Sequence, residues 1–209
     1  CLKPEAGLRG QVRCRGLEKV YKRQLQEATQ CAVTFRNNGA QTALPMRHWG
    51  SFLPGNGVGG SGVHWNGQTY RFLPSDFVAK SHNEERYGPL SEGMTVQDYG
   101  VTYEELEPHF DYFEKICGIC GTAGNLRGDI REGGNPFEGP RSDDYPNPPM
   151  QMTFSQDRFE ASARELGLNP FPVPSANMSR AYVNPLGLQL APCTYCGFCE
   201  KHGCGNYSK

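Results

Sequence analysis

The stretch Gly57-Val58-Gly59-Gly60-Ser61-Gly62-Val63-His64-Trp65-Asn66-Gly67 decides how the fold of this chain is interpreted. Because glycine lacks a Cβ, such a run lets the backbone approach a flat or anionic ligand closely and presents several N–H groups to it. His64, Trp65 and Asn66 would then add a nucleophilic or proton-transferring group, an aromatic plane and an amide. The alternative is a purely structural turn, with Trp65 in the core and His64 simply hydrogen-bonded.

The upstream part of this run imitates a dinucleotide-binding fingerprint. Residues 55–60 match G-x-G-x-x-G, and Asp76 follows at about the distance of the usual ribose-binding acid. That fingerprint requires a buried strand before it and a helix after it. Here the preceding segment is short and ends at Pro54, and residues 61–67 have no helical periodicity. We therefore do not expect a Rossmann motif at this position.

Composition and charge limit the class of protein. The 209 residues include 21 Lys and Arg against 22 Asp and Glu, and this near-balance excludes an electrostatic case for binding nucleic acid or an anionic membrane. No stretch approaches the roughly 20 apolar residues of a membrane span. The 26 glycines and 16 prolines predict many turns and long loops around a modest core. The chain has no initiator Met and no secretory signal, and it stops just after a cysteine cluster, so we expect an internal fragment.

We expect an α/β fold that is α+β in this stretch, with short helices, short strands and long Gly/Pro-rich loops. Residues 32–35 and 69–73 are predicted as strands, the first ended by a turn at 37–39 and the second by Pro74. Residues 133–149 hold five prolines and are predicted as a long loop.

Two helices carry clear sequence signals. The first is predicted over 102–117, with a capping box between Thr102 and Glu105, and with Pro108 separating a first turn from the main helix. The second is expected to be capped by Ser155 and ended by Gly167. The residues expected to face the core are Leu106, Phe110, Phe113 and Cys117 in the first helix and Phe159, Ala163 and Leu166 in the second.

The most specific chemical signal is Cys193-x2-Cys196-x2-Cys199-x4-Cys204. Three cysteines at successive x2 spacing are typical of a loop that wraps an iron–sulfur cluster, although the last gap in the ferredoxin run is x3. A zinc site, with His202 completing a Cys3His set, fits the spacing less well because zinc ligands usually come in separated pairs. Disulfides or free thiols are a further alternative. The second pair, Cys117-x-x-Cys120, has no redox pattern around it, and Cys117 is expected in the core.

The glycine run and several flanking motifs resemble the glucose–methanol–choline (GMC) oxidoreductase family, in particular its membrane-bound sugar and sugar-acid dehydrogenases. The flanking motifs are Thr34-Phe35-Arg36-Asn37, residues 41–47, Arg71-Phe72-Leu73-Pro74-Ser75-Asp76-Phe77 and residues 135–142. The resemblance covers residues 32–209, whereas residues 1–31 match poorly and read as a separate helical segment. It implies an internal part of a GMC-type FAD-binding domain, in which 133–149 is a loop and 193–204 the cysteine cluster.

The resemblance also implies the cofactor sites. Residues expected to line FAD are Gly57, Gly59, Gly60, Ser61, His64, Trp65, Asn66 and Gly67. In some members the His of such an His-Trp pair is bonded to the flavin 8α-methyl group, so His64 is a candidate covalent ligand. Relatives carry an iron–sulfur centre, [3Fe–4S] in some, so we expect a [3Fe–4S] or [4Fe–4S] cluster on Cys193, Cys196, Cys199 and Cys204.

The whole enzyme implied by the resemblance oxidises a CH–OH group of a sugar or sugar acid. Its electrons pass from FAD through the iron–sulfur centre to a multihaem cytochrome c subunit, and a small subunit with a twin-arginine signal exports it to the periplasm. Contact with the inner membrane is expected only through a partner subunit. The family's catalytic His pair has no counterpart in this sequence, so we name no catalytic base and expect this chain alone to be inactive. The alternative is a stand-alone zinc or iron–sulfur module with a structural glycine run.

Overall fold

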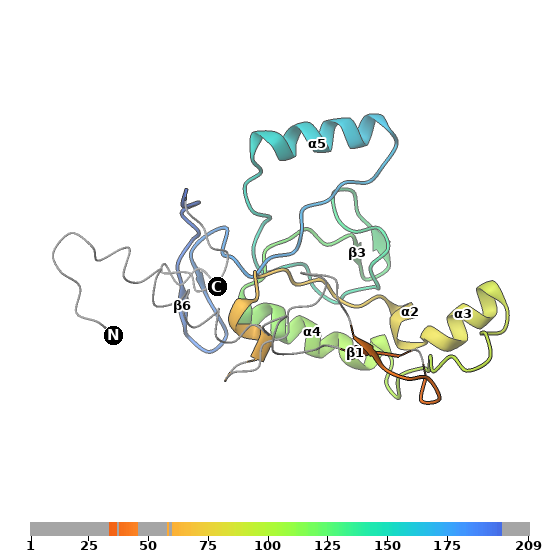
Figure 1. Ribbon diagram of the computed structural model, residues 1–209. Helices are drawn as coiled ribbons and strands as arrows, with labels where there is room; N and C mark the ends of the chain where they lie inside the picture. Colours follow the sequence, from red (N-terminus) through yellow and green to blue (C-terminus); the bar gives the residue numbers. More distant parts are fainter. Residues whose placement is uncertain (1–33, 37, 46–57, 59, 198–209) are drawn as a thin grey trace. The chain divides into compact units, whose positions relative to one another are not determined.

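The computed structural model describes residues 34–36, 38–45, 58 and 60–197 (Figure 1). These residues fall into two units that meet in sequence between Asn66 and Gly67, and each unit is described by itself. The helical segment expected before residue 32 and the boundary expected there lie outside the described residues. The mixture of helices and short antiparallel strand pairs agrees with the expected α+β character.

The first unit contains one hairpin and one 3-10 helix among its described residues. Strand β1, Thr34–Phe35, pairs antiparallel with β2, Leu44–Pro45. The connection turns at Asn38, whose side chain accepts a hydrogen bond from the Ala40 N–H at 3.0 Å. The turn predicted after the first strand is therefore confirmed. The 3-10 helix η1 spans Gly60–His64.

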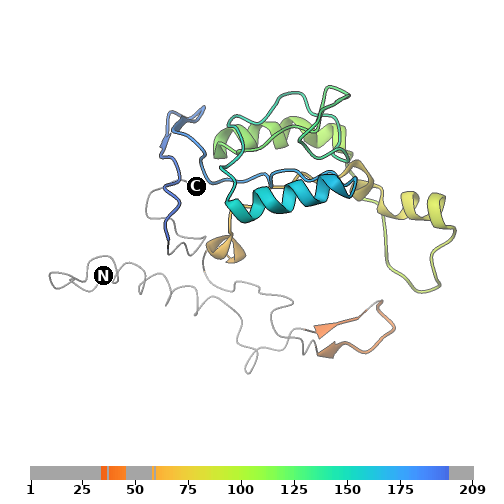
Figure 2. The same ribbon diagram turned by 90° about the horizontal axis from the view of Figure 1, so that it is seen from above.

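The second unit contains the remaining elements. Its helices are α2 (Pro74–Phe77), α3 (Ala79–Tyr87), α4 (Tyr103–Cys117) and α5 (Phe154–Glu165). Its strand pairs are β3 (Asn125–Leu126) with β4 (Asp129–Ile130), and β5 (Tyr182–Val183) with β6 (Gln189–Leu190). Irregular segments run between α4 and α5, the two longest helices (Figures 1 and 2). Within the described part, no helix is both long and apolar enough to cross a membrane.

Helix α4 begins as predicted but does not break at Pro108. The Thr102 N–H donates to Glu105 Oε2 at 2.8 Å and the Glu105 N–H donates to Thr102 Oγ1 at 3.2 Å, so the capping box is confirmed. The prediction of two helical pieces is wrong, because α4 runs through Pro108 to Cys117. Arg71 binds Glu107 on one side of the proline and Glu114 on the other, which holds both parts on one axis.

Two other expectations about local structure need correction, and a third is confirmed. Residues 69–73 do not form the predicted β-strand. The pairing with Ser175 is a single bridge at Gln68, and Pro74 is the first residue of α2. Helix α5 is capped by Thr153 rather than Ser155, since the Thr153 N–H reaches Gln156 Oε1 at 2.8 Å. Gly167 does end α5, with φ +73° and a Leu168 N–H to Ala163 O bond of 3.0 Å.

The predicted core faces of the two helices are only partly right. In α5 Ala163 is buried, but Phe159 and Leu166 are 71% and 77% exposed. In α4 Phe113 is 46% exposed, while Tyr103 and Glu114 are buried. The core of the second unit instead collects around α4 and the segments that follow it, and its buried apolar residues include Phe77, Tyr103, Ile119, Cys120, Ala123, Ala176 and Met178.

Candidate functional site

The described part of the glycine run forms an open turn. Gly60 starts η1 with φ +54°, and a Cβ built on Gly62 would meet nothing within 4 Å. The Trp65 N–H donates to Gly62 O at 3.2 Å, and the Trp65 side chain is half-buried, whereas Ser61 and Asn66 are exposed. An uncovered backbone of this kind suits the close approach of a planar ligand. Gly57, Gly59 and the side chain of His64 lie outside the described residues.

Gly67, the last residue of the run, is fixed where the second unit begins. Its φ is +89°, a backbone angle that favours glycine, and a Cβ would lie 3.2 Å from the side-chain nitrogen of Asn177, which would have to shift slightly. Its carbonyl accepts from the Ala176 N–H at 2.7 Å. Two residues later the Thr69 N–H donates to Pro174 O at 2.9 Å. The exit of the glycine run is therefore attached to residues 174–176.

The first two cysteines of the cluster motif lie on an exposed turn. Cys193 is half-buried and Cys196 is exposed. The Tyr195 N–H lies 3.5 Å from Cys193 Sγ, and Thr194 Oγ1 lies 3.2 Å from Cys196 Sγ. Backbone N–H groups aimed at cysteine sulfur are a feature of iron–sulfur sites. Cys199 and Cys204 lie outside the described residues, and among the residues that are described no group of three or more His, Cys, Asp or Glu is arranged to hold a metal ion.

One short segment, Pro174–Ser179, connects the glycine run with the cysteine turn. Its residues 174 and 176 bond to Thr69 and Gly67, and Met178 O accepts from the Cys193 N–H at 2.8 Å. Ala176 and Met178 are two residues apart, which is at most about 7 Å of chain. The end of the expected flavin segment and the start of the expected cluster therefore meet on the same backbone, within the second unit.

The alternate residues of this segment bond to Cys120. The Cys120 and Ser175 backbones exchange two hydrogen bonds, of 2.7 and 2.9 Å. The Cys120 thiol then donates to Asn177 O at 2.9 Å and accepts from the Ser179 N–H at 3.1 Å. Burial raises the pKa of this thiol, although the hydrogen bond from Ser179 opposes the shift. Cys120 is fully buried, whereas Cys117, which was expected in the core, is only half-buried.

A buried ionic cluster holds the segment that leaves the glycine run, and no local sequence pattern predicts it. Arg71, whose side chain is 3% exposed, donates to both oxygens of Glu114 at 2.9 Å and to Glu107 at 2.9 Å. Arg141, with a fully buried side chain, binds the same Glu114 carboxylate and stacks on Tyr145, with Cζ 3.7 Å from the ring centroid. Burial opposes the charge on Arg71, but its hydrogen bonds to Glu114 and Glu107 raise its pKa overall.

The third carboxylate of this cluster is Glu138. Its Oε1 accepts from the Gly124 and Asn125 N–H groups at 2.6 and 3.1 Å, while its Oε2 lies 3.6 Å from Arg141 Nη1. The cluster thus contains two cations and three carboxylates. Burial raises the pKa of Glu138 even though Arg141 acts in the opposite direction.

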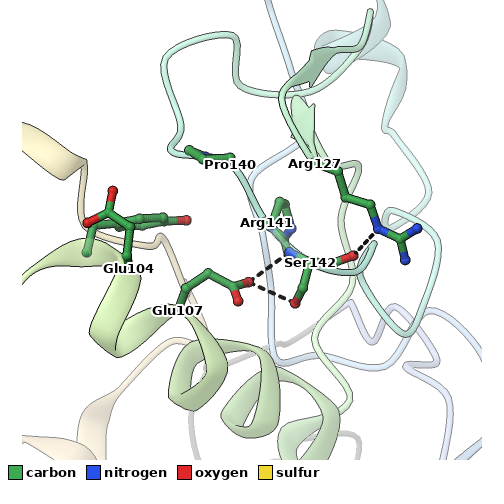
Figure 3. A pocket seen from close by; sticks show the side chains of 7 residues that line it. Glu104, Glu107, Arg127, Pro140, Arg141 and Ser142 are labelled. Atoms are coloured by element: carbon green, nitrogen blue, oxygen red, sulfur yellow. Dashed lines mark hydrogen bonds between the residues drawn. The ribbon is translucent and has the colours of Figure 1, made fainter.

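A shallow pocket lies beside this cluster (Figure 3). Glu107 points toward Ser142 in that view, and its Oε1 accepts from the Ser142 N–H and hydroxyl at 2.9 and 3.0 Å. Burial works against ionisation of Glu107, but the hydrogen bonds from Arg71 and Ser142 lower its pKa. A carboxylate with a lowered pKa and several donors is a poor general base. We interpret the lining of this pocket as structural; it consists of Tyr103, Glu104, Glu107, Arg127, Pro140, Arg141 and Ser142.

Comparison with known proteins identifies relatives, although no family model matches the chain. It is 42% identical to the gluconate 2-dehydrogenase flavoprotein of Pantoea cypripedii over 195 residues, which are 91% of this chain and 32% of that protein. It is 34% identical to the fructose dehydrogenase large subunit of Gluconobacter japonicus over 60% of this chain and 20% of that protein. It is 29% identical to the 6'''-hydroxyparomomycin C oxidase of Streptomyces lividus over 73% of this chain and 24% of that protein.

The chain thus spans about a third of the length of the gluconate 2-dehydrogenase flavoprotein, and less of the other two proteins. Two of the three are dehydrogenases and the third is an oxidase, so all are oxidoreductases by name. The resemblance stated from the glycine run and its flanking motifs is confirmed: this chain is similar to the gluconate 2-dehydrogenase flavoprotein and to the fructose dehydrogenase large subunit.

Proposed function

We propose that this chain is part of an FAD-dependent dehydrogenase that oxidises a CH–OH group of a sugar or sugar acid. Electrons would leave FAD through an iron–sulfur centre and reach a cytochrome c subunit. The observation that carries the proposal is the attachment of Gly67 and Cys193 to a single segment, at Ala176 and Met178. The names of the relatives, a flavoprotein and a sugar dehydrogenase subunit, support the same activity.

The described residues fit the two proposed cofactors. The open backbone at Gly62 and the left-handed Gly60 suit a flat flavin, with Ser61, Trp65 and Asn66 beside it and His64 as its candidate covalent ligand. Cys193 and Cys196 offer soft thiolate ligands with nearby N–H or O–H groups, which suits iron–sulfur chemistry. When bound, FAD supplies a hydride acceptor, and the iron–sulfur centre supplies one-electron transfer onward.

The chain's own contribution to this chemistry is to position the two cofactor segments. Arg71 ties the segment after Gly67 to helix α4 through Glu107 and Glu114. Because these ion pairs are buried, the segment is held by groups that solvent does not screen. The turn with Cys193 is tied to Met178. Both anchors belong to the second unit, so the geometry between them is set by one folded body.

The resemblance also guides proposals about the rest of the enzyme. They are a GMC-type FAD-binding fold across residues 32–209, a multihaem cytochrome c partner, and a small subunit with a twin-arginine signal. The complex would work in the periplasm and reach the inner membrane only through a partner.

Metal analysis of the anaerobically purified chain tests the proposal. We expect iron and acid-labile sulfide in similar amounts, with a broad brown absorption that dithionite bleaches. Stoichiometric zinc in a colourless protein would instead favour a stand-alone zinc module. Covalent attachment at His64 is tested separately on the intact dehydrogenase by acid precipitation: flavin found wholly in the supernatant would contradict it.

A further inference from the structure

We propose that Cys120 is a positioning residue that holds Cys193, the first cysteine of the cluster motif, in place through the backbone of Asn177–Ser179. That Cys193 is a cluster ligand rests on the proposed function, whereas the hydrogen bonds that connect Cys120 with Cys193 are all between described residues. Neither the spacing of Cys117 and Cys120 nor the cluster motif predicts this role.

Three hydrogen bonds link the Cys120 thiol, the Asn177–Ser179 backbone and the Cys193 N–H. The Cys120 thiol occupies the space between Asn177 O and the Ser179 N–H, at 2.9 and 3.1 Å. The residue between them, Met178, is fully buried and uses its carbonyl to hold the Cys193 N–H at 2.8 Å. The thiol therefore binds both peptide groups of Met178, and the second of them, between Met178 and Ser179, is the one whose carbonyl holds the Cys193 N–H.

The surroundings of Cys120 make this contact hard to replace. Its relative exposure is 0%, so water does not reach Asn177 O or the Ser179 N–H from this side. Its backbone is already bonded to Ser175, so the side chain is the group that continues the pairing toward residue 179. Buried peptide groups that lose their partner carry a desolvation penalty, and the local structure shifts to recover a partner.

The chain supplies a close control. Cys117 lies three residues earlier, at the end of α4, and its thiol is half-buried. Cys117→Ala also removes one sulfur atom, but from a position that is not part of the hydrogen bonds to Asn177 and Ser179. The conservative Cys120→Ser variant keeps one donor and one acceptor, so it should behave more like the natural protein than Cys120→Ala does.

The first test needs no metal. Amide hydrogen exchange is measured for Cys193 and Ser179 in the whole chain, with the amides of α4 as a monitor of global folding. In Cys120→Ala we expect both amides to exchange about 10-fold faster, while Cys117→Ala leaves them unchanged. An unchanged Cys193 amide in Cys120→Ala overturns the proposal. If Cys120→Ala loses protection throughout α4, Cys120→Val decides, because it fills the space but has no hydrogen-bonding atom: faster exchange at Cys193 with α4 still protected supports the proposal, and no change at Cys193 overturns it.

The second test uses the chain reconstituted anaerobically with ferrous iron and sulfide. We expect Cys120→Ala to alter the electron paramagnetic resonance spectrum or the reduction potential of the centre, with Cys120→Ser closer to the natural protein and Cys117→Ala indistinguishable from it. A centre identical in all four proteins overturns the proposal. If the natural chain takes up no iron, the proposed function fails at its cluster, and amide exchange alone decides the role of Cys120.

Discussion

Neutralising Glu114 should be among the most destabilising single changes in this chain. Glu114 is 2% exposed, and its two oxygens accept from Arg71 at 2.9 Å each and also from Arg141. Glu114→Gln keeps the shape but removes the charge and turns an NH2 group toward two cations. Breaking a buried ion pair on one side costs about 3–5 kcal/mol, because the remaining charge stays buried.

The structure places this variant near the lower end of that range. Arg71 keeps Glu107 at 2.9 Å, and Arg141 keeps Glu138 at 3.6 Å and the Asp143 carbonyl at 3.0 Å. A loss of about 3 kcal/mol, divided by a urea slope of about 2 kcal/mol/M, lowers the unfolding midpoint by about 1.5 M. The assay is urea unfolding followed by circular dichroism at a helical wavelength.

The matched control is Glu104→Gln, an exposed acid in the first turn of the same helix. Its loss should cost at most about 1 kcal/mol, through the helix dipole. If Glu114→Gln and Glu104→Gln lower the midpoint equally, the ionic cluster does not stabilise the fold as argued here.

Three further predictions concern local features of the fold. Gly67→Ala should lower the free energy of unfolding by about 1–3 kcal/mol, because φ is +89° and the new Cβ would lie 3.2 Å from the Asn177 side-chain nitrogen. Gly62→Ala, whose Cβ would meet no described atom within 4 Å, should change thermal unfolding little. Thr102→Ala should cost about 1 kcal/mol by removing the helix cap, and a midpoint equal to that of the natural protein would argue against the cap. Folding lowers the pKa of Glu107, so the stability that this carboxylate contributes is present above its unfolded pKa and is lost as the pH falls through its folded pKa. Between pH 6 and pH 3 the urea midpoint should therefore fall less in Glu107→Gln than in the natural protein.

Features that depend only on residues close together in the sequence could be predicted. The capping box at Thr102 and the Gly167 stop are local hydrogen-bond patterns, and both are present. The predicted helix break at Pro108 is wrong, because the low helix propensity of proline does not take tertiary contacts into account. The cost of a proline inside the helix is offset by Arg71, which lies more than thirty residues away in sequence.

The contacts that organise the candidate site could not be predicted in this way. Arg71 and Glu114 are 43 residues apart, and Cys120 and Ser179 are 59 apart. Nothing in the local pattern distinguishes Cys120 from Cys117, since only tertiary packing buries the one and leaves the other half-exposed. The motifs predict which residues bind the expected cofactors, whereas the fold identifies Pro174–Ser179 as the segment to which Gly67 and Cys193 are both attached.

The most direct test of the central claim follows electrons in the intact dehydrogenase that contains this chain. The enzyme is mixed anaerobically with a sugar acid such as gluconate, flavin absorbance is recorded, and samples frozen at intervals are examined for the iron–sulfur signal. The account predicts that flavin bleaching is followed by reduction of a centre that requires Cys193. A flavin that is reduced while no iron–sulfur centre changes, or a centre that persists unchanged in Cys193→Ser, would contradict it.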